Sequence, residues 1–442
     1  MTEGNIFRHL LRFTLPLLAG NLFQQMYNTV DTWVLGNFVG NHAFSAVGCI
    51  SPLINTLIGT FSGLAGGAGV VISQSFGAKD RTGLTAAVSA SLGLTAILSV
   101  MFTIIGLAMM PQMLALMKMP PELMPEATEY LTICFCGITG LLFYNMCSGI
   151  LRAMGDSRRP FYYLAAATVI NTALDLFFVL KLGMGVRGVA YATVIAQAVS
   201  ALLAFMALAT DGGIQLKPGN IRLEKTMLRR IICIGIPTAL QMGINQFSNI
   251  LVQSYINTFG ADCMGGWTAF QKLDQLNLLP MMSVSIAVMT FVGQNLGGGK
   301  LERAKKGVRI GLAMSAFFAC SGSLLIVSFA SGLVRFFSDA PGIVEYGTLF
   351  VKSIVPFHIV STFNHTYGGA LRGMGNTKAP MFSILAGLVV FRQLYLYVAA
   401  NFISNTPLMV VFSYPAGWMV CSGLMVCLYI HSRRKVLDRA QH

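Results

Sequence analysis

Long apolar stretches alternate with short polar turns along the whole chain. A helix needs about 20 apolar residues to cross a bilayer, so each stretch predicts a membrane-spanning helix. The breaks between them carry turn residues, as in segments 77–80 and 297–300. The twelve expected spans are 12–36, 44–73, 84–110, 126–151, 160–181, 186–209, 228–257, 264–293, 305–331, 345–371, 380–401 and 408–431.

The second half of the chain repeats the first with an offset of about 220 residues. The segment LRAMGDSRRP at 151–160 returns as LRGMGNTKAP at 371–380. Each repeat holds six spans, an even number, so both enter the membrane from the same side. We therefore predict an all-α membrane protein with twelve transmembrane helices in two parallel six-helix lobes, related by a pseudo-twofold axis along the membrane normal.

The repeat also predicts the domain organisation. We expect an N-terminal six-helix lobe (1–209), a cytoplasmic linker (210–226) and a C-terminal six-helix lobe (227–442). Two such lobes flanking a central cavity are typical of transporters that work by alternating access.

Composition and charge place the chain in a membrane. Hydrophobic residues make up 55% of it and charged residues 10%, with a mean hydropathy of +0.68, whereas soluble domains carry about 25% charged residues. The net charge is +14, and of the 30 Lys and Arg residues 23 fall on one side of the predicted spans and 4 on the other. This asymmetry predicts that both termini are cytoplasmic, and it explains the positive charge without nucleic acid as a partner.

Acidic residues inside the spans are candidate functional residues. Of 16 acids, Asp31, Asp175 and Asp274 fall well inside predicted spans. A charge at the centre of a membrane helix costs about 2.5 to 3.5 kcal/mol on insertion scales, so each of the three is a functional hypothesis.

Two of these acids have polar neighbours at helical spacing, which share a helix face. The neighbours are Gln24, Tyr27 and Asn28 before Asp31, Asn171 before Asp175, and the pair Thr193 and Gln197 on the sixth span. We predict one polar cluster inside the first lobe. When two carboxyl groups lie close together in a low dielectric, one of them holds a proton near neutral pH, as a proton-coupled carrier requires. The alternative is a hydrogen-bonded network that only fixes helix packing.

The second repeat serves as an internal control for this cluster. Val252 stands at the position equivalent to Asp31, and Tyr395 at the position equivalent to Asp175. The amides Asn245 and Asn249 keep the polar character of the equivalent first helix. Proton binding is therefore predicted in the first lobe, and the amides are candidates for lining the substrate cavity.

The second predicted lobe carries its own intramembrane charges. Asp274 and Arg392 are candidate substrate-cavity residues, either as a structural ion pair between helices or as a second coupling or substrate site. Lys272 is two residues from Asp274, so the two do not share a helix face. His358 and His365 are seven residues apart on the tenth span. Without a carboxylate or cysteine nearby they predict core or cavity-wall residues rather than a metal site.

Pro16 lies about one turn inside the first predicted span. It is a candidate hinge, because a proline inside a helix frees a carbonyl and permits a kink. Passive packing is the alternative role. The nine cysteines lack the paired spacing of zinc sites. The motifs of ATP hydrolysis, zinc proteases and serine hydrolases are not found. We expect no catalytic residue, metal site or cofactor.

In these features the chain resembles the multidrug and toxic compound extrusion (MATE) family. The segment from Pro16 to Asp31, with QQMYNTVD at 24–31, is similar to the family's first helix, and RAMGD at 152–156 with its echo at 372–376 is similar to its paired cytoplasmic loops. Asp31, Asn171 and Asp175 resemble the DinF-like branch, where this cluster binds the coupling proton. The NorM-like branch has sodium ligands on the seventh and tenth helices, where this chain lacks equivalent acids.

Together, the residues and the resemblance predict a secondary active antiporter of the inner membrane. We expect it to export organic, cationic or amphipathic compounds in exchange for protons, as a monomer in contact with membrane lipid. Sodium is the alternative coupling ion. The alternative function is a flippase for lipid-linked precursors or polysaccharides, which would need a cavity lined by several cations.

Overall fold

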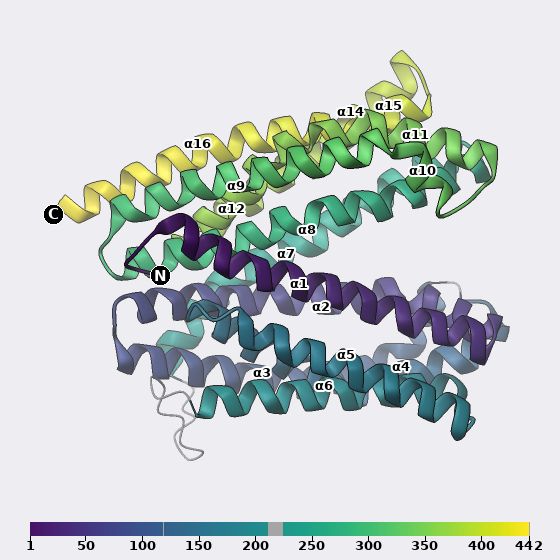
Figure 1. Cartoon of the computed structure of the whole chain (residues 1–442), viewed down its shortest axis with the longest axis horizontal. Coiled ribbons are helices and arrows are strands. Elements are labelled where there is room, and N and C mark those ends of the chain that lie inside the picture. The colour runs from purple at the N-terminus through teal and green to yellow at the C-terminus, as the bar shows by residue number, and fades with distance from the viewer. Residues whose placement is uncertain (118, 211–223, 442) are drawn as a thin grey trace. The chain divides into compact units, whose positions relative to one another are not determined.

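The part of the chain that the structure describes consists of helices joined by short turns. The computed structural model describes residues 1–117, 119–210 and 224–441, and those residues contain no strand. Figure 1 shows the arrangement of the helices. In chain order, with short 3₁₀ and π turns labelled η, the elements are α1 (Ile6–Val34), η1 (Leu35–Val39), α2 (Asn41–Gly77), α3 (Arg81–Leu116), η2 (Pro121–Leu123), α4 (Met124–Ala153), α5 (Arg158–Leu176), η3 (Phe177–Lys181), α6 (Gly185–Ala209), α7 (Lys225–Asn257), α8 (Ala261–Gly297), α9 (Leu301–Ser328), α10 (Ala330–Arg335), α11 (Pro341–Ile354), η5 (Val355–Phe357), α12 (His358–Gly373), α13 (Lys378–Ile384), η6 (Leu385–Phe391), α14 (Arg392–Val398), η7 (Ala399–Ile403), α15 (Pro407–Val411) and α16 (Ser413–Gln441).

The helices have the length and hydropathy of membrane spans. Eleven of the described helical segments are long and apolar enough to cross a bilayer, and α1 is not among them. Polar residues near its end, including Asn28 and Asp31, lower its hydropathy. Its 29 residues still span about 44 Å at 1.5 Å per residue, which exceeds the hydrocarbon thickness of about 30 Å. With α1 included, the segments follow the order of the twelve predicted spans.

The chain folds into two compact units whose boundaries lie inside α1 and α7. Unit 1 contains Met1–Leu15 and Ile236–His442, and unit 2 contains Pro16–Gly235. The predicted lobes, 1–209 and 227–442, differ from these units at their first helices, because the start of each of these helices belongs to the unit built from the other repeat. Most of the predicted linker, residues 211–223, lies outside the described residues.

Hydrogen bonds hold the start of α1 within unit 1. The guanidinium of Arg303 on α9 donates to the backbone oxygens of Gly4 at 2.8 Å and Glu3 at 2.9 Å. Lys300 forms an ion pair with Glu3 at 3.5 Å. The first residues of the chain are therefore fixed to the turn between α8 and α9.

The start of α7 is held within unit 2 in a comparable way. Arg230 donates to Oε1 of Gln74, near the end of α2, at 2.7 Å. A Cβ atom placed on Gly67 of α2 would lie 2.5 Å from Cα of Gly235, which is closer than two carbon atoms pack. Glycine at position 67 therefore permits the backbones of α2 and α7 to touch, as small residues do between membrane helices.

Inside unit 2, α4 packs against both α2 and α6. A Cβ atom placed on Gly140 of α4 would lie 3.0 Å from the backbone nitrogen of Ala198 on α6. The close approach of α4 and α6 helps fix the position of α6, the helix that carries Thr193 and Gln197.

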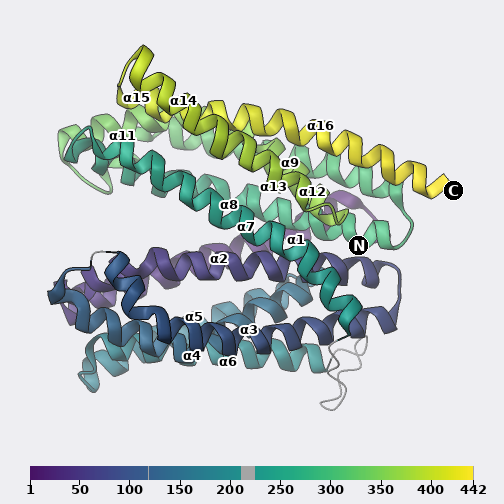
Figure 2. The same ribbon diagram turned by 180° about the vertical axis from the view of Figure 1, so that it is seen from behind.

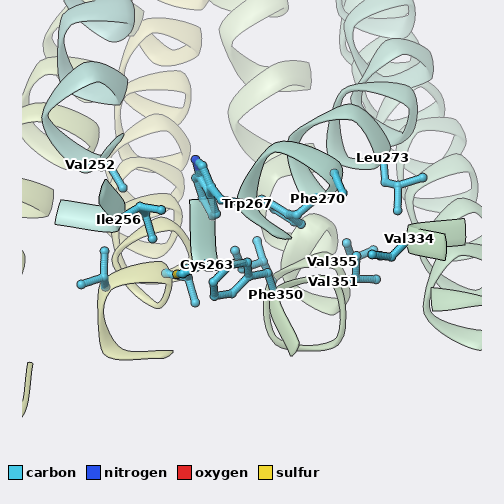
Figure 3. Packing of buried hydrophobic residues seen from close by; sticks show 14 of the residues in the cluster. Val252, Ile256, Cys263, Trp267, Phe270, Leu273, Val334, Phe350, Val351 and Val355 are labelled. Atoms are coloured by element: carbon cyan, nitrogen blue, oxygen red, sulfur yellow. The ribbon is translucent and has the colours of Figure 1, made fainter. Parts of the chain in front are cut away.

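Inside unit 1, a buried apolar cluster centres on Trp267 of α8. The ring of Trp267 lies 4.9 Å from that of Phe270 and 5.6 Å from that of Phe350 on α11. Figure 3 shows these residues together with Val252 of α7 and others of the cluster. Helix α16 runs beside α12 and α14 in both views (Figures 1 and 2). Trp418 and Tyr414 of this cluster contact the polar residues His358 and Arg392 of unit 1, which are described below.

Several π turns interrupt the helices close to the polar residues. The turn η1 begins four residues after Asp31, η3 begins two residues after Asp175, and η6 ends directly before Arg392. A π turn adds a residue to one helical turn and often marks a functional site. Each turn changes the face on which the following residues lie.

Candidate functional site

Two helices of unit 2, α1 and α5, bring two carboxyl groups together in its interior. Asp31 on α1 is 9% exposed, and Asn171 and Asp175 on α5 are fully buried. With its nitrogen facing the carboxyl groups, the amide of Asn171 donates to Oδ1 of Asp31 at 2.8 Å and to Oδ2 of Asp175 at 3.3 Å. The carboxyl groups of Asp31 and Asp175 also lie close enough to interact with each other electrostatically. We call Asp31 and Asp175 the acid pair.

Helices α6 and α4 complete the surroundings of the acid pair. The hydroxyl of Thr193 on α6 donates to Oδ2 of Asp31 at 3.4 Å, a long hydrogen bond. Tyr27 is buried one turn before Asp31 and interacts with Thr193. On α4, Tyr130 is buried and Cys134 is partly buried, and both lie close enough to Asp31 to interact with it electrostatically. No pattern in the sequence pointed to these two α4 residues.

The acid pair has no cationic partner among the residues that the structure describes. The ion pairs found there join other groups, and the groups acting on the two carboxyls are each other and neutral hydroxyl and amide groups. Two buried carboxylates without a cation repel each other and lose hydration. The arrangement therefore favours uptake of a proton or a small cation.

The other predicted first-lobe residues lie outside this buried group. Gln24 and Asn28 on α1 are exposed, and Gln197 on α6 is partly buried one turn beyond Thr193. Pro16 is partly buried and is the first residue of unit 2.

In unit 1, Arg392 is 1% exposed and is held by neutral groups. Its Nη2 donates to Oδ1 of Asn249 on α7 at 3.0 Å, and its Nε donates to the hydroxyl of Ser248 at 3.2 Å. The guanidinium lies 4.8 Å from the ring centroid of Tyr414, a cation–π contact. Asn245, one turn before Asn249, is partly buried.

Asp274 pairs with a histidine and not with Arg392, so the first of the two alternatives expected for these residues, an ion pair with each other, is wrong. Oδ1 of Asp274 on α8 lies 2.7 Å from Nε2 of His358 on α12. The distance is that of an ion pair, although the angle departs from that of a straight hydrogen bond. Arg392 does not reach Asp274 because its guanidinium points to α7, where a hydroxyl and an amide oxygen accept its hydrogen bonds. His358 is fully buried and His365 partly so.

The remaining intramembrane charges are at the surface. Lys272 on α8 and Lys352 on α11 are both exposed. The residues that the structure describes contain no group of three or more His, Cys, Asp or Glu placed to hold a metal ion.

Comparison with known proteins relates the chain to a family of membrane transporters. The family model described as MatE matches residues 16–177 and again residues 237–398. The probable multidrug resistance protein YpnP of Bacillus subtilis is 30% identical over 378 residues, which cover 85% of this chain and 84% of YpnP. The multidrug export protein MepA of Staphylococcus haemolyticus is 23% identical over 443 residues, covering 99% of this chain and 96% of MepA.

Solved structures show the same fold. A crystal structure of MATE in the bent conformation aligns with a TM-score of 0.94 at 21% identity, covering 99% of this chain and 98% of that chain. A structure of MATE in the straight conformation aligns with a TM-score of 0.90 at 22% identity, covering 99% of this chain and 98% of that chain. These likenesses confirm the predicted all-α membrane fold.

Proposed function

The chain belongs to the MatE family, and from this premise we propose that it is a secondary antiporter which exports small organic compounds in exchange for protons. The observation that supports the proposal is the acid pair: two buried carboxyl groups joined by the amide of Asn171, without a cation beside them in the described residues. Such a pair gains stability when one carboxyl takes a proton. Binding and release of that proton supply the coupling.

The first helix links the proton to the substrate in this proposal. Asp31 lies fifteen residues after Pro16, about four helical turns at 3.6 residues per turn, and Pro16 marks a unit boundary. Protonation of Asp31 removes its need for the polar groups of α5, so α1 can shift between a straight and a kinked form. Proton and substrate then compete for the same conformations of α1.

The substrate class follows from the family and from the polar residues of the predicted cavity. Relatives are named as multidrug proteins, and we propose cationic or amphipathic organic compounds as cargo. The candidate cavity residues are Gln24, Tyr27, Asn28, Thr193, Gln197, Asn245, Asn249, Asp274 and Arg392. We place the protein in the inner membrane with both termini in the cytoplasm, because of its asymmetric positive charge.

Flippase activity on lipid-linked substrates receives less support. Such a protein needs several cations that face its substrate to hold a pyrophosphate. In the described residues Arg392 is buried and bonded to neutral groups, and Lys272 and Lys352 lie exposed on separate helices. No cluster of these three cations is formed.

The test is transport of a substrate panel into inverted membrane vesicles, under a pH gradient or a sodium gradient imposed separately. We expect transport under the pH gradient, and no transport after a sodium jump at clamped pH. Asp31→Asn should abolish transport while leaving expression and thermal stability unchanged, because the amide keeps the shape but cannot take up the proton.

The matched control is Thr29→Ala, which removes an exposed hydroxyl that donates to the backbone oxygen of Gln25 in the same helix, and it should leave proton coupling intact. Wild-type exchange rates in Asp31→Asn vesicles would exclude Asp31 as the coupling residue. Transport driven by sodium alone would replace the proton with sodium as the coupling ion.

A further inference from the structure

A groove in unit 1 lies between the start of α1 and the start of α9. Its volume is about 480 Å³. Residues 4–7 form the wall on the side of α1, and the wall on the side of α9 consists of Glu302, Arg303, Lys306 and Ile310. None of these residues belongs to the acid pair or to the predicted substrate cavity, so the groove is a separate feature of the molecule.

The groove carries more positive than negative charge. Its acidic side chain, Glu302, forms an ion pair with Lys305. The guanidinium of Arg303 donates to backbone oxygens near the start of the chain, among them that of Gly4, and carbonyl groups do not cancel its charge. Lys306 is exposed, and it forms no ion pair among the residues that the structure describes. Arg303 and Lys306 therefore make the groove complementary to an anion.

The position of the groove relative to the bilayer follows from α9. Exposed residues lie three or four positions apart along one face of this helix, beginning with Lys306 and Arg309 and continuing with Ala313 and Phe317. The stretch 310–328 has no charged residue. It covers about 28 Å at 1.5 Å per residue, close to the hydrocarbon thickness of about 30 Å. Lys306 and Arg309 therefore lie at the level of the lipid headgroups.

The walls of the groove also offer apolar surface beside the cations. The side chain of Phe7 on α1 is 50% exposed, and Ile310 lies one turn after Lys306 on α9. An amphipathic anion can place its charge at Lys306 and its apolar part against Phe7 and Ile310. A free phosphate would leave both apolar side chains uncovered. The chemistry of the groove thus favours a phospholipid over a soluble anion.

The repeat shows that these cations are not needed for orientation alone. At the offset of 220 residues, Lys306 and Arg309 correspond to Ala86 and Ser89 near the start of α3. Orientation in the membrane requires an excess of Lys and Arg on one side, but it does not require them to gather at one groove. The cluster at the start of α9 is therefore a feature of the second repeat that orientation does not explain.

We propose that this groove binds an anionic phospholipid of the membrane, with the headgroup phosphate at Lys306 and the acyl chains along Ile310 and Phe317 of α9. Cations beside a membrane helix attract anionic lipid by this electrostatic effect. Because α1 and α9 form the groove together, the bound lipid helps to hold the start of α1 within unit 1. The proposal does not depend on the antiport proposed above.

The test is native mass spectrometry of the full chain in detergent, titrated with phosphatidylglycerol or with phosphatidylcholine of the same acyl chains. We expect the first phosphatidylglycerol to bind at least about tenfold more tightly than phosphatidylcholine, because it carries a net negative charge. Lys306→Gln should weaken phosphatidylglycerol binding about fivefold, the effect of one cation at a headgroup. It should leave phosphatidylcholine binding unchanged.

The matched control is Arg81→Gln, which removes an exposed cation at the start of α3 in unit 2. It should leave the affinity for the first phosphatidylglycerol unchanged. Equal losses in Lys306→Gln and Arg81→Gln would overturn the proposal, because attraction to the charge of the whole surface would then explain the binding. Equal affinity of the native chain for the two lipids would overturn it as well.

Glycerol 3-phosphate distinguishes a lipid from a soluble phosphate ester. At the same concentration as the bound phosphatidylglycerol it should not displace the lipid, because it cannot cover Phe7 and Ile310. Displacement would show that the groove recognises phosphate alone, and the lipid would be rejected as its occupant.

Thermal unfolding in detergent gives a second measurement of the same site. A ligand that binds the folded state raises the midpoint of unfolding, so phosphatidylglycerol should raise it more in the native chain than in Lys306→Gln. Equal rises in the two proteins would contradict a lipid site at Lys306. Because Lys306 is exposed, the variant should fold like the native chain, and its midpoint without lipid verifies this.

Discussion

At the scale of single residues, we expect Asn171 to determine how the acid pair responds to pH. Its amide donates to both carboxyl groups, and hydrogen bonds to an ionised group favour the ionised form. Asn171→Ala removes these bonds and so favours the protonated form. We expect the pH of half-maximal transport to move upward by about one unit, equivalent to about 1.4 kcal/mol.

The measurement is the pH dependence of substrate exchange in vesicles. The control is Asn145→Ala on α4, where the amide donates to the backbone oxygen of Leu141 in its own helix. An unchanged profile in Asn171→Ala would show that the amide does not set proton affinity. Asn145→Ala should retain the native profile.

The sequence predicted the acid pair because an acid inside a membrane helix is costly and its partners follow helical spacing. Asn171 and Asp175 are four residues apart, so their contact is local. The pairing of Asp274 with His358 has no such signal, because the two residues are on different helices and their rotation is set by packing. The rotation of α1, which is also set by packing, explains why Gln24 and Asn28 are exposed although they lie close to Asp31 in the sequence.

At the scale of helices, Pro16 is the proposed hinge of α1. We expect Pro16→Ala to leave proton binding by the acid pair intact but to reduce proton-driven substrate export at least tenfold, because an unbroken backbone ladder resists the kink. Spin labels at positions 12 and 24, both exposed in the native chain, report the bend in a cysteine-free background. A label distance that is the same at high and low pH in the otherwise native protein would refute the hinge.

The contact between α4 and α6 predicts a stability effect. Gly140→Val places side-chain atoms against the backbone at Ala198, and overpacking of this kind costs about 1 to 3 kcal/mol. We expect a lower midpoint of thermal unfolding in detergent. Gly423→Val on α16 is the control, since a Cβ atom there meets nothing within 4 Å. Equal midpoints for the two variants would contradict the tight packing of α4 on α6.

Helix existence and order were predictable because apolar length is a strong signal, but the interruptions were not. The predicted span 380–401 is a sequence of α13, η6, α14 and η7 in the structure. A π turn changes the backbone of an apolar segment without changing its hydropathy. The order of the spans could therefore be predicted from the sequence, whereas the π turns inside them could not.

At the scale of the whole molecule, the distribution of Lys and Arg predicts orientation. A green fluorescent protein fused to the C-terminus should fluoresce, and alkaline phosphatase fused at the same place should be inactive, because both termini are expected in the cytoplasm. Fusion of the two reporters to the turn at 182–184, between η3 and α6, should give the opposite result. Matching results at the two sites would contradict the orientation.

The repeat predicted two halves, but it could not predict that they exchange the starts of their first helices. Sequence similarity aligns Pro16 with Pro237 and says nothing about which unit the preceding residues pack against. Long-range contacts decide this, such as those of Arg303 with Glu3 and of Arg230 with Gln74.

This exchange affects the order in which the protein can be completed during synthesis. Gly4 and Arg303, which hydrogen-bond to each other, are separated by 299 positions. The first helix leaves the ribosome long before the turn that receives its beginning has been made, and at about 5 to 20 residues per second the delay is on the order of tens of seconds. Unit 2 is one continuous segment and can be completed first, whereas unit 1 begins with the first residue of the chain and can be completed only after the second repeat has been made.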